Sequence, residues 1–364
     1  MIRKTTTFIF ALIVFGNFTG VPLQGYSEQG DVQNPKLKAY FIDVGMGDAI
    51  FLDIPPKDCM LIDAGSWDND GIDNLMGFLD EFFGDPEHKA YNKTIDVAVA
   101  THQHKDHIQG MLNVLKKYKV TSYIDNGVGW KYNKSEATDL MIQVGDLIKS
   151  KKVKHYYYND SLISAKGKKG VYTDGVIDPF SGVDIFVLGA TPDPVDSKEN
   201  NNSIVLKAQC GDISFLLTGD AETKEERRIT EKLKTYDNAE ALNVDVYKAG
   251  HHGSNTATGE EFIELASPSI SVVSVGVAEE SPKTRDFRLP KESVVKRLDK
   301  QTANSMEETW NVQAFPDKKP KGAKNEKPKM YSSRKEIYFT SSDGTILFAT
   351  DGKKLETELY EREQ

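Results

Sequence analysis

Three histidines and an aspartate crowd into one six-residue segment of this chain, His102-Gln103-His104-Lys105-Asp106-His107. A strand-like run at residues 95–100 precedes the segment, and a helical pattern at 108–112 follows it. Imidazoles and carboxylates are ligands of divalent transition metals. The first two histidines lie two apart in extended backbone and point the same way, whereas the aspartate and the last histidine fall in the first helical turn. The segment therefore predicts a metal site.

Two further histidines and two aspartates extend the set of candidate ligands. His251 and His252 follow a strand-like run at 244–247, and Asp63 and Asp220 each end an apolar strand. An aspartate in such a position is commonly only a turn former or helix cap, but its repetition beside two histidine clusters favours a functional role. One of the two adjacent histidines can be a ligand and the other a packing residue, and their spacing leaves open which.

The elements that must position these side chains alternate between strands and helices in two comparable halves. We expect strands at 37–44, 48–54, 59–65, 95–100, 123–126, 183–188, 203–208, 213–217, 244–247 and 270–275, and helices at 72–83, 136–150, 221–235, 260–266 and 292–299. Residues 337–340 and 345–348 are predicted to close the fold as a hairpin across Ser342-Asp343-Gly344. This order fits two sheets packed face to face with helices outside, an α/β fold.

The N-terminus has the pattern of an export signal. Arg3 and Lys4 precede an apolar run at residues 8–15, which is too short to cross a bilayer at about 20 residues. We therefore predict a signal peptide over residues 1–25, with an uncertain cleavage site. The protein is expected to be secreted or periplasmic, or membrane-anchored if the signal is not cleaved.

Charge and cysteine content narrow the remaining choices. The net charge of −9 argues against broad binding to a nucleic-acid backbone, although a local basic patch stays possible. Residues 316–335 are rich in lysine and proline, and we expect a mobile basic loop there, either solvated or in contact with DNA. Cys59 and Cys210 lie in strand-like segments of different halves, and both are interpreted as core thiols.

The order of these motifs resembles the metallo-β-lactamase superfamily. The run Phe41-Ile42-Asp43-Val44-Gly45-Met46-Gly47-Asp48-Ala49-Ile50 is similar to the opening of the C-terminal hydrolase domain of ComEC-type DNA-uptake proteins. Further segments that match that subgroup in order are Leu61–Gly65, Asn202–Leu206, Leu216–Glu222, Lys248–Ser254 and Phe339–Ile346. The resemblance covers residues 36–352, and it implies an αββα sandwich with one or two divalent metal ions, Zn or Mn, between the sheets.

The resemblance also implies how the ligands are shared. His102 and His104 would hold the first ion, while Asp106, His107 and one of His251 and His252 would hold the second. Asp220 would bridge the two ions, and Asp63 would orient the loop or the attacking water, so Asp106 and Asp63 are the expected catalytic residues. Many members of the superfamily place a third histidine on the first ion where this chain has Asn201-Asn202-Ser203.

Two other departures separate the chain from the subgroup. Met46 replaces the usual glutamine, and Leu289-Pro290 stands where the subgroup often has His-Pro. The membrane helices of a complete DNA-uptake channel are not expected in this chain, which we interpret as an exported catalytic domain.

Paired divalent ions suit phosphodiester hydrolysis, and they also suit the opening of a strained amide or lactone. The subgroup resemblance favours a phosphodiesterase or DNA nuclease. The alternatives are a hydrolase of β-lactams, lactones or other non-phosphate substrates, and an inactive or metal-binding interaction protein. Candidate substrate-binding residues are Lys105, Asn202, Ser203, Ser254 and Asn255, and Trp67 and Trp130 could stack on a base or merely pack.

Overall fold

Two large β-sheets pack against each other in the computed structural model of the chain, which describes residues 32–67, 69–128, 136–191, 196, 198–277, 282–317 and 328–360. The predicted signal peptide and Trp130 lie outside the described residues. Within the described residues, no helix is both long and apolar enough to cross a membrane.

The first sheet has eight strands and belongs mainly to the first half of the chain. Its strands, in spatial order, are β16 (Leu355–Tyr360), β15 (Thr345–Thr350), β1 (Leu37–Phe41), β2 (Ile50–Ile54), β3 (Asp58–Ile62), β4 (Thr94–Val99), β5 (Lys119–Asp125) and β6 (Lys154–Tyr157). Pairing is antiparallel from β16 to β3 and parallel from β3 to β6.

The second sheet has six strands. They are, in order, β14 (Ile337–Phe339), β11 (Ile270–Val273), β10 (Val246–Lys248), β9 (Ile213–Leu217), β8 (Val205–Cys210) and β7 (Asp184–Gly189). Pairing is parallel from β14 to β9 and antiparallel from β9 to β7. A separate two-stranded sheet joins β12 (Ser305–Ala314) to β13 (Lys329–Lys335).

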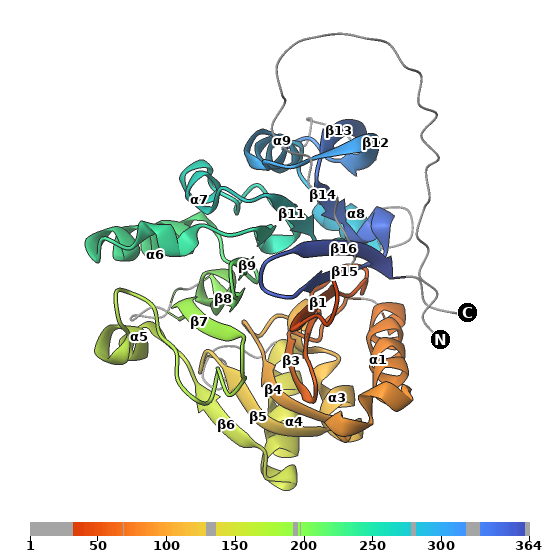
Figure 1. Cartoon of the computed structure of the whole chain (residues 1–364), viewed down its shortest axis with the longest axis vertical. Helices are drawn as coiled ribbons and strands as arrows, with labels where there is room; N and C mark the ends of the chain where they lie inside the picture. The colour runs from red at the N-terminus through yellow and green to blue at the C-terminus, as the bar shows by residue number, and fades with distance from the viewer. Residues whose placement is uncertain are drawn as a thin grey trace.

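Helices cover the outer faces of both sheets (Figure 1). The first half contributes α1 (Asn69–Gly84), α2 (Lys105–Ile108), α3 (Met111–Lys117), α4 (Glu136–Lys151) and α5 (Asp160–Lys166). The second half contributes α6 (Thr223–Thr235), α7 (Glu260–Ala266), α8 (Pro282–Phe287), α9 (Glu292–Gln301) and α10 (Thr340–Asp343). Short 3₁₀ turns are η1 (Pro86–Tyr91), η2 (Glu199–Asn202), η3 (Ala239–Leu242) and η4 (Gly250–Gly253).

Alternating strand residues build three layers of core. In β1, Ala39 and Phe41 face the other sheet, whereas Tyr40 packs under the outer helices. In β9, Phe215 and Leu217 face the first sheet and Leu216 faces outwards. Because side chains alternate along a strand, each sheet is buried on both faces. The predicted αββα sandwich is therefore confirmed, and both cysteines are buried free thiols, as expected.

The predicted closing hairpin is wrong. β14 pairs with β11 in the second sheet, whereas β15 pairs with β1 and β16 in the first. Residues Thr340–Asp343 form the helical turn α10 between them, and the Asp343 carboxylate accepts a hydrogen bond from the amide of Phe339. The chain thus crosses from one sheet to the other, where the sequence predicts a tight turn.

The predicted mobile loop at 316–335 is also wrong in part. Lys329–Lys335 forms β13, which pairs with β12 in register from Trp310 to Ala314. The strand has few apolar residues, so its pairing with β12 and not its own periodicity fixes its conformation. Residues 318–327 of the loop lie outside the described residues.

Glycines let three loops meet at one edge of the first sheet. A side-chain carbon added to Gly65 would lie 2.1 Å from the backbone carbonyl carbon of Asp106 and from the amide nitrogen of His107. At Gly47 it would lie 2.4 Å from the carbonyl oxygen of Gly65. The amide of Asp48 donates to the carbonyl of Asp106 over 3.0 Å, which joins the loops directly.

We predict that Gly65→Ala destabilises the fold by about 3 kcal/mol, because the added methyl group must displace the backbone around Asp106. Urea unfolding monitored by circular dichroism measures the loss. Gly84→Ala is the matched control, since a side chain there meets no atom within 4 Å. Equal stability of the two variants would contradict the tight loop contact.

Candidate metal centre

The candidate ligands follow the carboxyl ends of four strands that run parallel to a neighbour in their sheet. Asp63 follows β3, the 102–107 segment follows β4, Asp220 follows β9, and His251 and His252 follow β10. In open α/β sheets, ligands bind beyond the carboxyl ends of the strands. A hydrogen bond of 2.9 Å from the amide of Ile204 to the carbonyl of Thr101 connects the two halves here.

Two imidazoles are held from behind and present their second nitrogen to the cluster. His107 Nδ1 lies 2.7 Å from Asp63 Oδ2, and His252 Nδ1 lies 3.0 Å from the carbonyl oxygen of Ser274. Their Nε2 atoms lie 3.2 Å and 3.5 Å from Asp220 Oδ1. His252 Nε2 is also 3.3 Å from Asp106 Oδ2. Both histidine side chains are fully buried, which is the arrangement of histidines that bind metals.

His102 and His104, the other predicted pair of ligands, are also held by neighbouring polar groups, but they lie on a more exposed side of the cluster. His104 Nε2 lies 2.7 Å from Glu199 Oε2, and His104 Nδ1 lies 3.0 Å from His102 Nε2. The His102 Nδ1 atom faces the hydroxyls of Thr101 and Ser203 at 3.2 Å and 3.4 Å. The side chain of His104 is 36% exposed, whereas that of His102 is buried.

Asp220 lies between the two groups of imidazoles. Its Oδ1 atom faces His107 and His252, and its Oδ2 atom lies 4.0 Å from His102 Nε2 and 3.8 Å from His251 Nε2. The amide of Asp220 donates to the Ser203 hydroxyl over 3.2 Å, which fixes the carboxylate's backbone. The two donor sets, Asp106-His107-Asp220-His252 and His102-His104-Asp220, therefore share one carboxylate.

The fully buried donor set Asp106-His107-Asp220-His252, which we call the closed set, has unsatisfied atoms that fit a divalent ion. Asp106 Oδ1, His107 Nε2, Asp220 Oδ1 and His252 Nε2 are buried and, although they lie close to one another, form no hydrogen bond of acceptable geometry with any described residue. Ligands about 2.1 Å from a tetrahedral ion lie roughly 3.4 Å apart, close to the 3.2–3.5 Å measured between these side chains. An ion would satisfy atoms that would otherwise carry the cost of burial.

Electrostatics favour a charged carboxylate at Asp220 and a neutral imidazole at His102. Burial opposes ionisation of Asp220, but His252, His107 and His251 outweigh it and lower the pKa of this carboxyl well below its usual range. Burial and the neighbouring histidines lower the pKa of His102 well below its usual range, which favours the neutral ligand form.

His251 and His252 are adjacent in the sequence but have different surroundings. Both have left-handed φ angles, 49° and 51°, which are uncommon for residues other than glycine. His252 is buried beside Asp106, whereas His251 is 26% exposed and contacts Thr256 and Asn200. His252 is thus the one of the pair that belongs to the closed set.

A buried ion pair beneath the ligands escaped sequence reasoning. Lys248 Nζ lies 2.7 Å from Asp48 Oδ2, and both side chains are 1% exposed. Asp48 Oδ1 is 3.7 Å from His252 Nδ1, and Asp48 Oδ2 is 3.8 Å from His107 Nδ1. Asp48 belongs to the motif that resembles ComEC-type domains, but only the fold brings it 200 residues along the chain to Lys248. Glu199 was missed as well.

The predicted substrate-binding residues differ in their position relative to the histidine–aspartate cluster. Asn202 is buried and its side chain bonds both backbone polar groups of Asp196, so it fixes a loop and does not face the cluster. Ser203 contacts His102 and Asp220. The hydroxyl of Ser254 lies 3.0 Å from that of Thr256. Asn255 is exposed, and Lys105 lies over the ring of Trp67.

Asp63 supports the site and does not face its open side. It accepts hydrogen bonds from the amide and hydroxyl of Thr101, each over 2.8 Å, besides the contact with His107. It is therefore a positioning residue, whereas Asp106 lies among the candidate ligands.

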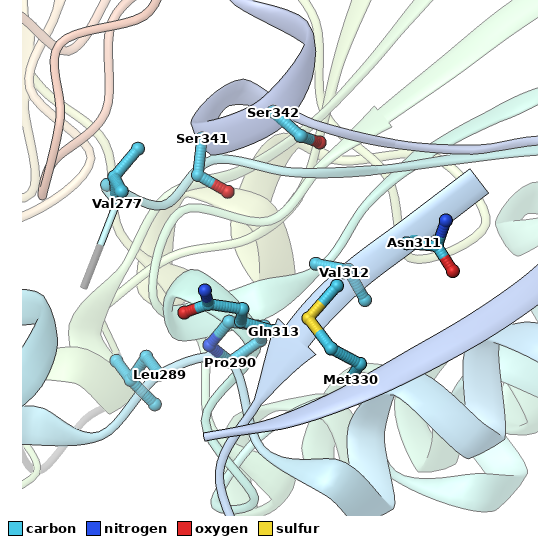
Figure 2. A pocket seen from close by; sticks show the side chains of 10 residues that line it. Val277, Leu289, Pro290, Asn311, Val312, Gln313, Met330, Ser341 and Ser342 are labelled. Atoms are coloured by element: carbon cyan, nitrogen blue, oxygen red, sulfur yellow. The ribbon is translucent and has the colours of Figure 1, made fainter. Parts of the chain in front are cut away.

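A separate cavity of about 200 Å³ is lined by residues of β12, β13 and α10 and of the segment before α9 (Figure 2). Leu289, Pro290, Val312, Gln313 and Met330 are among its lining residues, and none of the candidate ligands lines it. Leu289, which stands where the subgroup often has histidine, is buried in the outer core of the second sheet. It is therefore not part of the metal centre.

Fold and site define a class of protein: an αββα sandwich whose strand ends hold a histidine–aspartate cluster able to bind divalent metal. The family model "Metallo-beta-lactamase superfamily" matches residues 42–277. The chain belongs to this superfamily, whose members usually act as metal-dependent hydrolases.

Curated relatives confirm the resemblance to ComEC-type proteins. The chain is 26% identical to ComE operon protein 3 of Bacillus subtilis over 277 residues, 71% of this chain and 30% of the relative. It is 33% identical to Recombination protein 2 of Haemophilus influenzae over 104 residues, 29% and 11% of the two chains. It is also 33% identical to Competence protein ComA of Neisseria gonorrhoeae over 100 residues, 28% and 13% of the two chains. The chain thus matches less than a third of each relative's length.

Solved structures show weaker likenesses. The metallo-beta-lactamase fold protein YhfI from Bacillus subtilis gives a TM-score of 0.41 at 12% identity over 73% of this chain and 94% of YhfI. Igni18, a metallo hydrolase from Ignicoccus hospitalis, gives 0.36 at 14% identity over 71% and 91% of the two chains. Likenesses this weak carry no argument about activity.

We predict that Asp63→Asn weakens metal binding by about 10- to 100-fold, because His107 loses the charged acceptor that orients its ring. Competition with a chromogenic chelator measures the affinity. Asp96→Asn is the matched control, since that carboxylate accepts the Cys59 amide at 3.0 Å, away from the cluster. Unchanged affinity in correctly folded Asp63→Asn would rule out the positioning role.

We predict that Asp48 and Lys248 are energetically coupled. Lys248→Met leaves a buried carboxylate unpaired, and the free energy of unfolding should fall by about 3–5 kcal/mol. The double variant Asp48→Asn/Lys248→Met should lose less than the sum of the two single variants. Urea unfolding in EDTA, which removes any contribution from bound metal, gives the double-mutant cycle. Additive losses would show that the two side chains are independent.

Proposed function

We propose that the chain is a metal-dependent phosphodiesterase or nuclease. The observation that carries the proposal is the carboxylate of Asp220, which is shared by two adjacent donor sets. Two such sets are what a pair of divalent ions requires, and paired ions are the usual machinery of phosphodiester hydrolysis. The names of the relatives support the nucleic-acid reading, because one is a recombination protein and another a competence protein.

The candidate ligands would form two ion sites that differ in burial. Asp106, His107, Asp220 and His252 would hold one ion, and His102, His104 and Asp220 the other. When bound, these ions would supply a Lewis acid and a water of lowered pKa.

The chain's own residues prepare the site for that chemistry. Asp63 and the Ser274 carbonyl hold two imidazoles with Nε2 towards the cluster, so no reorientation is needed when a ligand arrives. The buried walls around His107 and His252 exclude water from one side. His104 and His251 are partly exposed, and they mark the side from which a substrate can approach.

Export of the enzyme belongs to the same proposal. The signal-like N-terminus supports it, and an exported nuclease would meet nucleic acid outside the cytoplasm. Secretion by the native host, followed by N-terminal sequencing of the released protein, would test this part separately.

Activity assays with the full chain loaded with Mn²⁺ or Zn²⁺ test the proposed reaction. We expect cleavage of single- or double-stranded DNA and of bis(p-nitrophenyl) phosphate, loss of cleavage in EDTA, and recovery when the metal is restored. Asp220→Asn should lower the rate of hydrolysis by more than roughly 100-fold. Substitution of a residue that only orients a metal ligand costs up to about that much, whereas Asp220→Asn removes a ligand from both donor sets.

Asp245→Asn provides the matched control, since Asp245 bonds the Ser214 amide away from the cluster. Cleavage of a chromogenic cephalosporin alone would overturn the proposal in favour of a non-phosphate substrate. Absence of both bound metal and turnover would instead favour an interaction protein.

A further inference from the structure

An aromatic ring flanked by two lysines lies beside the metal centre. Lys283 Nζ is 4.9 Å and Lys105 Nζ is 5.6 Å from the ring centroid of Trp67. The ring of Phe287, a residue that is 44% exposed, lies 5.9 Å from that of Trp67. We call these four residues, from the loop after β3 and from α2 and α8, the Trp67 ledge.

No carboxylate of the described residues neutralises the charge of the ledge. Among the residues that the structure describes, neither Lys105 nor Lys283 forms an ion pair with a carboxylate, although acidic residues outnumber basic ones in the chain, 55 to 46. Both lysines are partly exposed. Two free ammonium groups beside aromatic rings are a combination that recognises phosphates next to bases.

The ledge and the metal centre share their loops. Lys105 stands between two candidate ligands in the sequence, His104 and Asp106. The amide of Trp67 donates to the carbonyl of Met46 over 2.8 Å, and the amide of Gly65 to that of Asp48 over 2.9 Å. A substrate that lies on the ledge is therefore adjacent to the candidate ligands.

A groove with both polar and apolar walls continues from Lys105 along the outside of the first sheet. It has a volume of about 540 Å³, within the range of ligand pockets, and its walls come from α1, α2, α3 and α4. Asn69, Gln109 and Asn113 supply amide groups to it, and Asp73 supplies a carboxylate. Gln109 Oε1 is buried and has no hydrogen-bond partner among the described residues, so the groove offers an unused acceptor.

We propose that the Trp67 ledge binds single-stranded nucleic acid, with an unpaired base stacked on the aromatic rings and the flanking phosphates on Lys105 and Lys283. This inference rests on the proposed phosphodiesterase activity and names its substrate. Lys283 also lies 5.9 Å from the Phe287 ring, and its flexible chain allows the ammonium group to leave the rings for a phosphate while a base takes its place. A duplex fits poorly, because its bases are already stacked on both faces.

Fluorescence anisotropy of a labelled single-stranded oligonucleotide of roughly 12 nucleotides measures binding to the Trp67 ledge. The full chain is measured both loaded with Zn²⁺ and in EDTA, where no metal-dependent cleavage can occur. Trp67→Leu and Phe287→Leu should each weaken binding by roughly tenfold. Tyr236→Leu is the matched control, since Tyr236 is 48% exposed at the end of α6, away from the ledge.

Salt dependence separates phosphate contacts from loss of structure. In Lys105→Gln/Lys283→Gln, the slope of log K against log salt concentration should become shallower by about 1.4, because each lost phosphate contact removes about 0.7 for a single strand. Lys300→Gln, on the exposed side of α9, removes a charge elsewhere and should leave the slope unchanged. Retained metal content shows that each variant is folded.

The outcomes distinguish this inference from the proposed function. Unaltered oligonucleotide binding in all ledge variants overturns the ledge, even if bis(p-nitrophenyl) phosphate is hydrolysed. Duplex bound as tightly as single strand, with the same sensitivity to Trp67→Leu, overturns the preference for single strands. Ledge-dependent binding without any phosphodiester hydrolysis supports the ledge and refutes the proposed reaction.

Discussion

A single buried carboxylate, Asp220, connects the parts of this molecule that matter for its chemistry. An ionised side chain in such a place is costly unless opposite charge surrounds it. Here imidazoles contact both of its oxygens, His107 from the first half of the chain and His252 from the second among them. The two sheets must therefore meet in one register for the charge to be satisfied. A divalent cation between the same side chains would complete that balance.

The ligands depend on a layer of residues behind them. Asp63, Glu199 and the Ser274 carbonyl each hold one imidazole nitrogen and leave the other for the cluster. Beneath them, the Asp48–Lys248 pair places a second carboxylate near two histidines without adding net charge. The loops can come this close only because Gly47 and Gly65 have no side chain. Precision in the site is thus achieved by backbone contacts as much as by the ligands themselves.

Much of the fold and of the ligand set could be predicted from the sequence, and the limits have physical causes. The apolar runs of β1 and β9 predict strands, because each strand is buried on both faces. An apolar run does not indicate which sheet a strand joins, so the sequence wrongly predicts β14 and β15 as neighbours. β13 lacks an apolar pattern of its own, and its structure comes from pairing with β12.

The site shows the same division between local and long-range information. The 102–107 segment identified four candidate ligands because a strand end and a helical turn set their directions locally. Lys248 and Asp48 went unrecognised, since nothing in either segment says that the other lies 2.7 Å away. Spacing also could not separate His251 from His252. Their surroundings in the fold do so, because His252 lies beside Asp106 and His251 is partly exposed.

Burial divides the centre into two unequal parts, and this asymmetry has a chemical consequence. His107 and His252 are enclosed, so an ion among them would exchange only through motion of the surrounding loops. His104 is 36% exposed and is oriented by Glu199, an acid that is itself partly exposed. The segment where many relatives have a third histidine instead presents Ser203 to His102. The second donor set, His102-His104-Asp220, therefore has fewer strong ligands and more contact with solvent than the closed set. A substrate oxygen can take a place among the ligands on this side.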